Sequence, residues 1–115
     1  MVCKRAEIKR IAKEFAIKLK ERNIDVKFIV LFGSYAWGVP RGTSDIDLAV
    51  ISPQFKRMSQ LKRLELLSDI SRKISISLPI DIDVVGFTPD EIDHAGYFDL
   101  AAQIREKGDI ILKAA

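Results

Sequence analysis

Two stretches of the chain carry apolar residues three or four positions apart, with charged residues between them. This spacing places the apolar side chains on one face of a helix and is typical of a surface helix packed on a core. It predicts one helix over residues 4–22, ending at Asn23, and another over residues 58–74. The repeating positions are Ile8, Ile11, Ala12, Phe15 and Leu19 in the first stretch and Leu61, Leu64, Leu67, Ile70 and Ile74 in the second.

Three apolar runs predict strands. The run KFIVLF, residues 27–32, is continuous enough to be buried on both faces of a sheet. The run IDLAVI, residues 46–51, predicts a second strand that ends at Ser52, and residues 80–87 predict a third. The segment between the first two strands is rich in Gly and Pro, so we expect a loop there, with a short helical turn after Ser34.

The C-terminal part has the signals of helix starts and stops. Thr88, Pro89 and the acidic pair that follows resemble an N-cap, a first-turn proline and an acidic first turn. Residues 97–107 predict a further helix that stops at Gly108, and residues 109–112 a last short strand. The order of these elements predicts an α/β fold, a small mixed β-sheet packed with helices, as one domain over residues 1–115.

Composition excludes several classes of protein. The chain is 48% apolar and 30% charged, and no apolar stretch approaches the roughly 20 residues of a membrane span, so we expect no membrane association. A single cysteine, Cys3, fits a reducing compartment, and we expect a cytoplasmic protein. The net charge of +3 comes from the two basic helices, but no aromatic residues alternate with the basic ones, so direct nucleic-acid binding is not expected.

The candidate chemistry lies between the first two strands, in the sequence GSYAWGVPRGTSDID. Gly33 and Ser34 follow a strand, where a turn of small residues can present backbone N–H groups to an anion. Asp45 and Asp47 are two positions apart, so on an extended segment their carboxylates share one face. Phosphate-binding groups beside two carboxylates are what a complex of Mg²⁺ with a nucleotide requires.

In these residues the chain resembles the minimal nucleotidyltransferase (MNT) branch of the nucleotidyltransferase superfamily, specifically its antitoxin members with the GSX10DXD spacing. The resemblance implies the nucleotidyltransferase fold and a third carboxylate on a later strand. The sequence offers Asp81 and Asp83 for this role. The family's third aspartate commonly precedes a hydrophobic pair that leads into a Thr-Pro turn, which favours Asp83 over Asp81.

The resemblance also implies roles for these residues. Asp45, Asp47 and Asp83 would be the catalytic and metal-binding residues, holding two Mg²⁺ ions, and Gly33 and Ser34 would bind the nucleotide phosphates. Relatives often carry an arginine where this chain has Trp37, and Arg41 is the candidate to replace it. Trp37 itself would pack the loop or stack on a base. A purely structural alternative is that Asp45 caps a turn and Asp83 lies on an exposed strand face.

The implied function is the transfer of AMP from ATP to a hydroxyl acceptor. MNT proteins are paired with HEPN-type toxins, so the expected acceptor is a tyrosine of such a toxin, placed over the loop at residues 33–42, with this chain as the antitoxin. Two alternatives remain open. One is transfer to a small hydroxylated molecule, such as an aminoglycoside. The other is an antitoxin that neutralises its toxin by binding alone.

Overall fold

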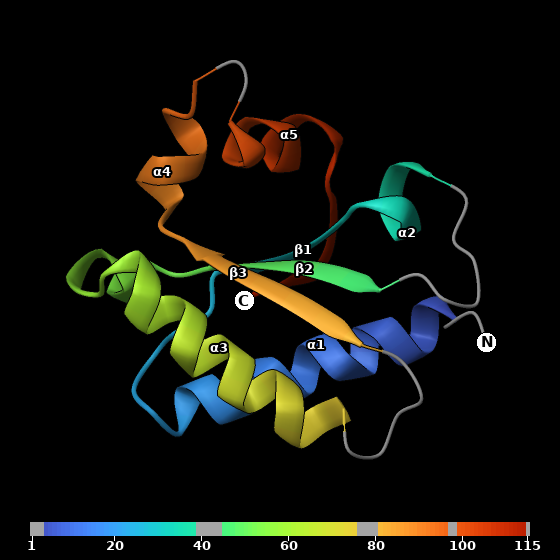
Figure 1. Cartoon of the computed structure of the whole chain (residues 1–115), viewed down its shortest axis with the longest axis horizontal. Helices are drawn as coiled ribbons and strands as arrows, with labels where there is room; N and C mark the ends of the chain where they lie inside the picture. The colour runs from blue at the N-terminus through green and yellow to red at the C-terminus, as the bar shows by residue number, and fades with distance from the viewer. Residues whose placement is uncertain (1–3, 39–44, 76–80, 97–98, 115) are drawn as a thin grey trace.

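A four-stranded mixed sheet forms the centre of the molecule (Figure 1). The computed structural model describes residues 4–38, 45–75, 81–96 and 99–114. The strand order is β3-β2-β1-β4, in which β1 pairs antiparallel with β2 and β4, and β2 pairs parallel with β3. The strands are β1 (Phe28–Phe32), β2 (Ile46–Ile51), β3 (Ile82–Phe87) and β4 (Asp109–Lys113). The helices are α1 (Arg5–Lys20), α2 (Ser34–Trp37), α3 (Gln60–Ser75), α4 (Pro89–Asp93) and α5 (Leu100–Lys107), with a 3-10 helix, η1 (Pro53–Arg57).

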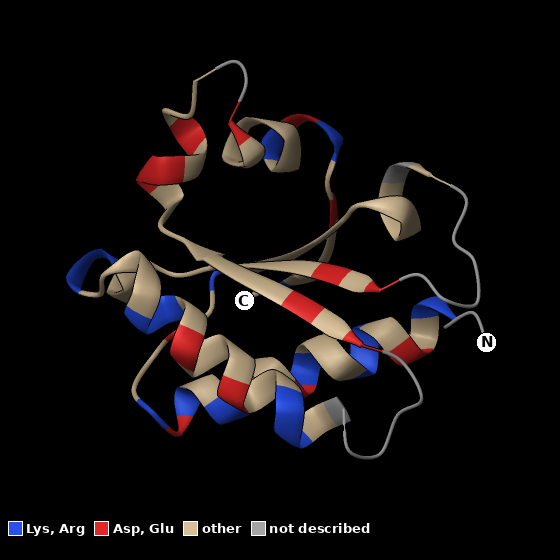
Figure 2. Ribbon diagram, in the orientation of Figure 1, with Lys and Arg blue, Asp and Glu red and all other residues tan. Residues whose placement is uncertain are grey.

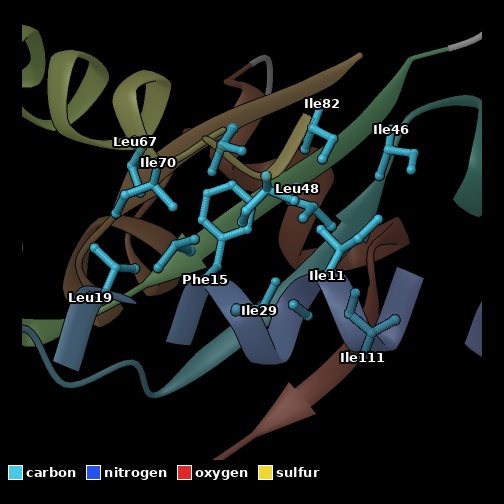
Figure 3. Close-up of a cluster of buried hydrophobic side chains, with 14 of the residues drawn as sticks. Ile11, Phe15, Leu19, Ile29, Ile46, Leu48, Leu67, Ile70, Ile82 and Ile111 are labelled. Carbon is cyan, nitrogen blue, oxygen red and sulfur yellow. The ribbon is translucent and has the colours of Figure 1, made fainter. Parts of the chain in front are cut away.

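Helices cover both faces of the sheet. In Figure 1, α1 and α3 lie on one side of it, and α4 and α5 on the other. The larger core lies under α1 and α3, where Phe15 and Leu67 meet the sheet side chains Ile29 and Leu48 (Figure 3). A smaller cluster on the other face packs Ile104 of α5 against β1 and β2. The alternation of strand side chains between two faces thus gives the sheet two separate cores.

Most of the predicted elements are confirmed. The α/β class, the mixed sheet, both long helices and all four strands are present within a few residues of their expected bounds. The helical turn after Ser34 is α2, and Thr88 forms a complete capping box with Glu91 at the start of α4. The helix expected over residues 97–107 begins at Leu100, and residues 97–98 lie outside the described part of the chain.

One prediction about α3 is wrong. The apolar repeat places Leu61 and Leu64 on the same face as Leu67, Ile70 and Ile74, but these two leucines are 63% and 52% exposed. The buried face consists instead of Leu67, Ile70 and Ile74, together with two polar residues, Arg63 and Ser71. The helix therefore has a second, exposed apolar strip that the core does not use.

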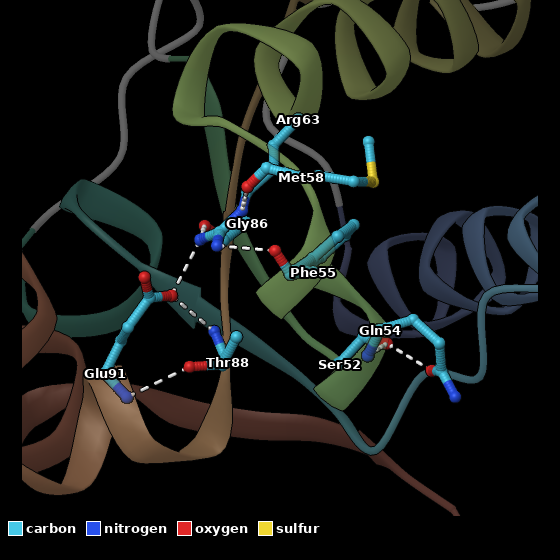
Figure 4. A network of polar contacts seen from close by, with 8 residues as sticks. All are labelled: Ser52, Gln54, Phe55, Met58, Arg63, Gly86, Thr88 and Glu91. Atoms are coloured by element: carbon cyan, nitrogen blue, oxygen red, sulfur yellow. Dashed lines mark hydrogen bonds and ion pairs between the residues drawn. The ribbon is translucent and has the colours of Figure 1, made fainter.

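Arg63 is the most buried charged residue described, at 5% exposure, and it joins three elements (Figure 4). Its guanidinium donates to the carbonyl oxygens of Phe55, in η1, and Gly86, in β3, and to Glu91 Oε1, in α4, at 2.6, 3.3 and 2.7 Å. Burial acts to raise the pKa of Glu91, but the hydrogen bonds and charge of Arg63, with the Thr88 amide, outweigh it and lower that pKa. A buried arginine is tolerated here because its donors have partners.

Among the described residues, no helix is both long and apolar enough to cross a membrane.

We expect Phe15→Ala to destabilise the fold strongly, because it removes a fully buried ring from the contact between α1 and the sheet. Its cost should be about 3–5 kcal/mol in the free energy of unfolding. Ile17→Ala, at a 60% exposed position on the same helix, should cost less than about 0.5 kcal/mol. Urea unfolding of both variants measures the difference, and equal losses would contradict the assignment of α1's buried face.

Candidate active site

The register of the sheet brings three of the predicted carboxylates together. Asp47, in β2, lies opposite Phe32 of β1 on one side and opposite Asp83 of β3 on the other. Asp45 comes directly before β2, where the Ile46 amide donates to the Asp81 carbonyl oxygen. Because neighbouring residues in register point to the same face of a sheet, Asp47 and Asp83 project side by side. The three predicted residues Asp45, Asp47 and Asp83 therefore form one cluster.

The Gly33 backbone lies directly against the Asp47 carboxylate. A Cβ at position 33 would fall on Asp47 Oδ2, and the φ angle of Gly33 is +72°, in the region that favours glycine. Ser34, the next residue, begins α2 and is partly buried. The turn predicted to bind phosphate thus lies on the β1 side of Asp47, opposite the side where Asp83 lies.

Two further predictions concern residues beyond what the structure describes. Arg41, the candidate phosphate-binding cation, lies outside the described residues. Trp37 ends α2, but its side chain also falls outside the described part. The roles of both stay predictions.

The carboxylates strongly affect one another. The pKa of Asp47 rises from 3.8 to about 6, first because the side chain is partly buried, and then because of the negative charges of Asp83 and Asp45. Burial also raises the pKa of Asp83, followed by its hydrogen bond with the Asp45 side chain and by the charges of Asp45 and Asp81. The cluster therefore favours a proton or another cation.

Charge is segregated across the molecule (Figure 2). The segments 45–51 and 81–93, which contain the cluster, have seven acidic residues and no basic ones. By contrast, η1 and α3 together carry six basic residues and two acidic ones, as does α1. The negative potential of the site would repel a nucleoside triphosphate unless cations neutralised it.

The donor set fits Mg²⁺, which prefers carboxylate oxygens. Among the described residues, however, no group of three His, Cys, Asp or Glu side chains is already arranged around a metal position. Mg²⁺ is usually bound by one or two carboxylates together with substrate phosphates rather than by a complete protein cage.

A pocket of about 490 Å³ opens beside the cluster, on the side away from Gly33. The sheet contributes Asp45, Asp81 and Asp83 to its lining, and α3 contributes Leu64, Ser68 and Arg72. The sequence motif of the site does not include these α3 residues. Their spacing of four along one helix was the available signal, but the apolar repeat of this helix was interpreted only as a face that packs on the core.

Comparison with known proteins identifies the family of this chain. The family model described as "Polymerase beta, Nucleotidyltransferase" matches residues 14–114. The chain belongs to the polymerase beta nucleotidyltransferase family. The predicted nucleotidyltransferase fold is therefore confirmed, and the carboxylate cluster beside Gly33 and Ser34 lies within the matched region.

Two relatives from Methanocaldococcus jannaschii are named "putative protein adenylyltransferase". One is 51% identical over 45 residues, which is 39% of this chain and 51% of the relative. The other is 36% identical over 75 residues, which is 65% of this chain and 74% of the relative. The match to the first spans about half of that protein's length.

Solved structures agree on the fold of this nucleotidyltransferase. A structure described as a putative nucleotidyltransferase from Sulfolobus solfataricus has a TM-score of 0.64 at 19% identity, covering 95% of this chain and 83% of its own. A toxin–antitoxin structure with AMP-PNP has a TM-score of 0.56 at 26% identity, covering 89% of this chain and 73% of its own. A mutant toxin–antitoxin structure named MntA-HpeT has a TM-score of 0.58 at 19% identity, covering 97% of this chain and 75% of its own.

We expect Asp47→Asn to stabilise the metal-free fold at neutral pH. The folded state holds the Asp47 proton more tightly than the unfolded state does, so wild-type stability falls as pH rises from about 4 to about 6 and then levels off. The variant lacks this loss. Its gain in the free energy of unfolding over the wild type should approach zero below pH 4. Above pH 6 this gain should be at most roughly 3 kcal/mol, and solvent screening at this partly exposed site reduces it further.

Urea unfolding in EDTA at pH 3.5 and pH 7.5 measures this gain. Asp25→Asn, at an exposed site next to Lys20, is the control and should show no such gain at pH 7.5. Equal stability of Asp47→Asn and wild type at both pH values would contradict the charge repulsion.

Proposed function

We propose that this chain transfers AMP from ATP to a hydroxyl group of a partner protein, and that it acts as an antitoxin in doing so. The proposed acceptor is a tyrosine of a HEPN-type toxin. The observation that carries the proposal is the convergence of Asp45, Asp47 and Asp83 beside the Gly33–Ser34 turn. Relatives named protein adenylyltransferase and the structural likeness to a toxin–antitoxin pair with AMP-PNP support it.

The reaction forms one P–O bond and breaks another. The acceptor oxygen attacks the α-phosphorus of ATP, and the bond from that phosphorus to the oxygen bridging the α- and β-phosphates breaks, so pyrophosphate leaves. Because charge develops on the leaving group, positioning and electrostatic stabilisation provide most of the catalysis. Gly33 would let the backbone approach the phosphates closely, and the Ser34 hydroxyl would donate to them.

Asp45, Asp47 and Asp83 would hold Mg²⁺, which supplies positive charge to the phosphates when bound. Asp83 lies on the side of Asp47 away from the phosphate-binding turn. Its carboxylate is therefore suited to accept the proton of the acceptor hydroxyl. Burial and neighbouring charges raise the pKa of Asp83, and a more basic carboxylate accepts a proton more readily.

Asp47→Asn should abolish AMP transfer while the chain stays folded. The variant removes a negative ligand between the proposed phosphate and acceptor sides, which should lower kcat/KM by about a thousandfold. The assay incubates the chain with labelled ATP, Mg²⁺ and the protein encoded beside its gene, and measures AMP added to that protein by mass. EDTA should abolish transfer by the wild type as well.

Near-normal transfer by Asp47→Asn would refute the role of Asp47. A wild-type chain that binds its partner but never transfers AMP would favour the binding-only antitoxin. Transfer to a small hydroxylated compound, with none to the partner protein, would favour the small-molecule enzyme.

Asp83→Ala should reduce transfer far more than Asp81→Ala. Both aspartates are exposed and two positions apart, so each is a matched control for the other. Only Asp83 lies in register with Asp47. Steady-state rates should fall at least about a hundredfold for Asp83→Ala, with the affinity for Mg²⁺ and ATP changed much less. A dead Asp81→Ala beside an active Asp83→Ala would reverse the assignment.

A further inference from the structure

The two sides of the carboxylate cluster differ. Gly33 and Ser34 occupy the β1 side of Asp47, so the phosphates and the departing pyrophosphate belong there under the proposed function. In phosphoryl transfer the attacking and leaving oxygens lie roughly in line on opposite sides of phosphorus. The acceptor must then approach from the other side, past Asp83 and β3, which is an edge strand of the sheet.

A continuous groove begins on that side. The 490 Å³ pocket beside Asp83 shares Leu64, Val84 and Val85 with a second pocket of about 420 Å³, which extends toward Leu61 and Gly86. The groove therefore runs between α3 and the outer side of β3 and opens onto the carboxylates. A strand of six residues spans roughly 20 Å, which is enough for several residues of an extended polypeptide.

The α3 wall of the groove is apolar at one end and basic at the other. Leu61, Leu64, Ser68 and Arg72 repeat at intervals of three and four, so they share one helix face. Both leucines are more than half exposed, although the inner face of α3 is buried. Two exposed leucines one turn apart, next to the partly buried Val85, are typical of a contact surface.

The charge of this wall indicates the chemistry of its occupant. The side chain of Arg72 is 74% exposed, and its ion pair with Asp69 is distant, at 3.7 Å. An occupant with apolar residues against the leucines and an acidic residue beside Arg72 would complement the groove.

Two outward-facing carbonyl groups of β3 are already bonded by α3. The Ser71 hydroxyl donates to the Ile82 carbonyl oxygen at 2.6 Å, and Arg63 donates to that of Gly86 at 3.3 Å. A segment in the groove therefore cannot form the regular hydrogen bonds of a fifth strand along all of β3. Side-chain contacts with the leucines would provide the recognition.

We propose that this groove, lined by Leu61, Leu64, Arg72 and Val85, binds an extended segment of the acceptor protein and delivers its hydroxyl residue to Asp83. The inference rests on the proposed function, and it places the acceptor on the β3 side rather than over residues 33–42. The segment carries apolar side chains against the leucines and an acidic residue beside Arg72.

The test compares Leu61→Ser/Leu64→Ser and Arg72→Glu with the wild type, using the protein encoded beside this chain's gene as the probe. Ile17→Ser is the matched control, since Ile17 is equally exposed on α1 and borders a different groove. Partner affinity is measured by calorimetry, AMP transfer by mass, and ATP affinity in the presence of Mg²⁺ by fluorescence.

We expect each groove variant to weaken partner affinity and raise the KM for the partner about tenfold, with kcat and the KM for ATP within about twofold of the wild type. Ile17→Ser should match the wild type. Unchanged partner affinity and KM in the leucine variant would overturn the groove and leave the proposed function intact, and an unaffected Arg72→Glu would overturn the acidic contact. A wild type that binds the partner without transferring AMP would refute the proposed function, while the affinities would still decide the groove.

Discussion

The contact between the Gly33 backbone and the Asp47 carboxylate determines how the rest of the site is arranged. A Cβ at position 33 has no room beside Asp47 Oδ2, and the positive φ angle of this residue is costly for other residue types. The contact joins the end of β1 to the start of β2 in a fixed register, with Phe32 opposite Asp47. The turn therefore lies on one side of the central carboxylate and Asp83 on the other, and the proposed function assigns the phosphates to the first side and the acceptor to the second.

The same cluster carries an energetic conflict that a ligand can relieve. Three acidic side chains gather where burial and mutual repulsion raise the pKa values of Asp47 and Asp83. An arrangement that costs stability in the free protein is common at functional sites, because the bound cation or substrate removes the cost. The basic residues that balance the charge of the chain lie mainly on α1, η1 and α3 and not within the segments that hold the cluster. Among the residues that line the pocket beside the cluster, Arg72 is the basic one, so a bound cation would add to its charge in neutralising the site.

The sequence was sufficient for features that depend on local periodicity. The apolar runs correctly predicted the strands that carry Asp47 and Asp83, and the helical repeat correctly identified Phe15 and Leu19 as core. It was not sufficient where contacts are distant in sequence. Nothing local indicates that Gly33 touches Asp47, that Arg63 is buried against Glu91, or that Leu61 and Leu64 are left outside the core. The apolar residues of α3 lie on more than one face of the helix. The sequence of this helix alone therefore does not determine which face packs on the sheet.

Arg63 lies on the face of α3 that packs on the sheet, whereas the exposed leucines lie on a face that contacts solvent. The inner face of α3 covers the sheet and bonds two carbonyl groups of β3, of which Figure 4 shows the one at Gly86. These bonds limit unwanted pairing at this edge strand. Leu61 and Leu64 are exposed on the outer face of α3. Exposed leucines lower the solubility of a protein, and packing of the core does not require them at these positions. The same buried arginine holds η1 and α4 against β3, so the groove wall and the strand that carries Asp83 are fixed relative to each other. Under the proposed function, a rigid wall beside Asp83 would reduce the entropy lost when an acceptor segment is positioned there.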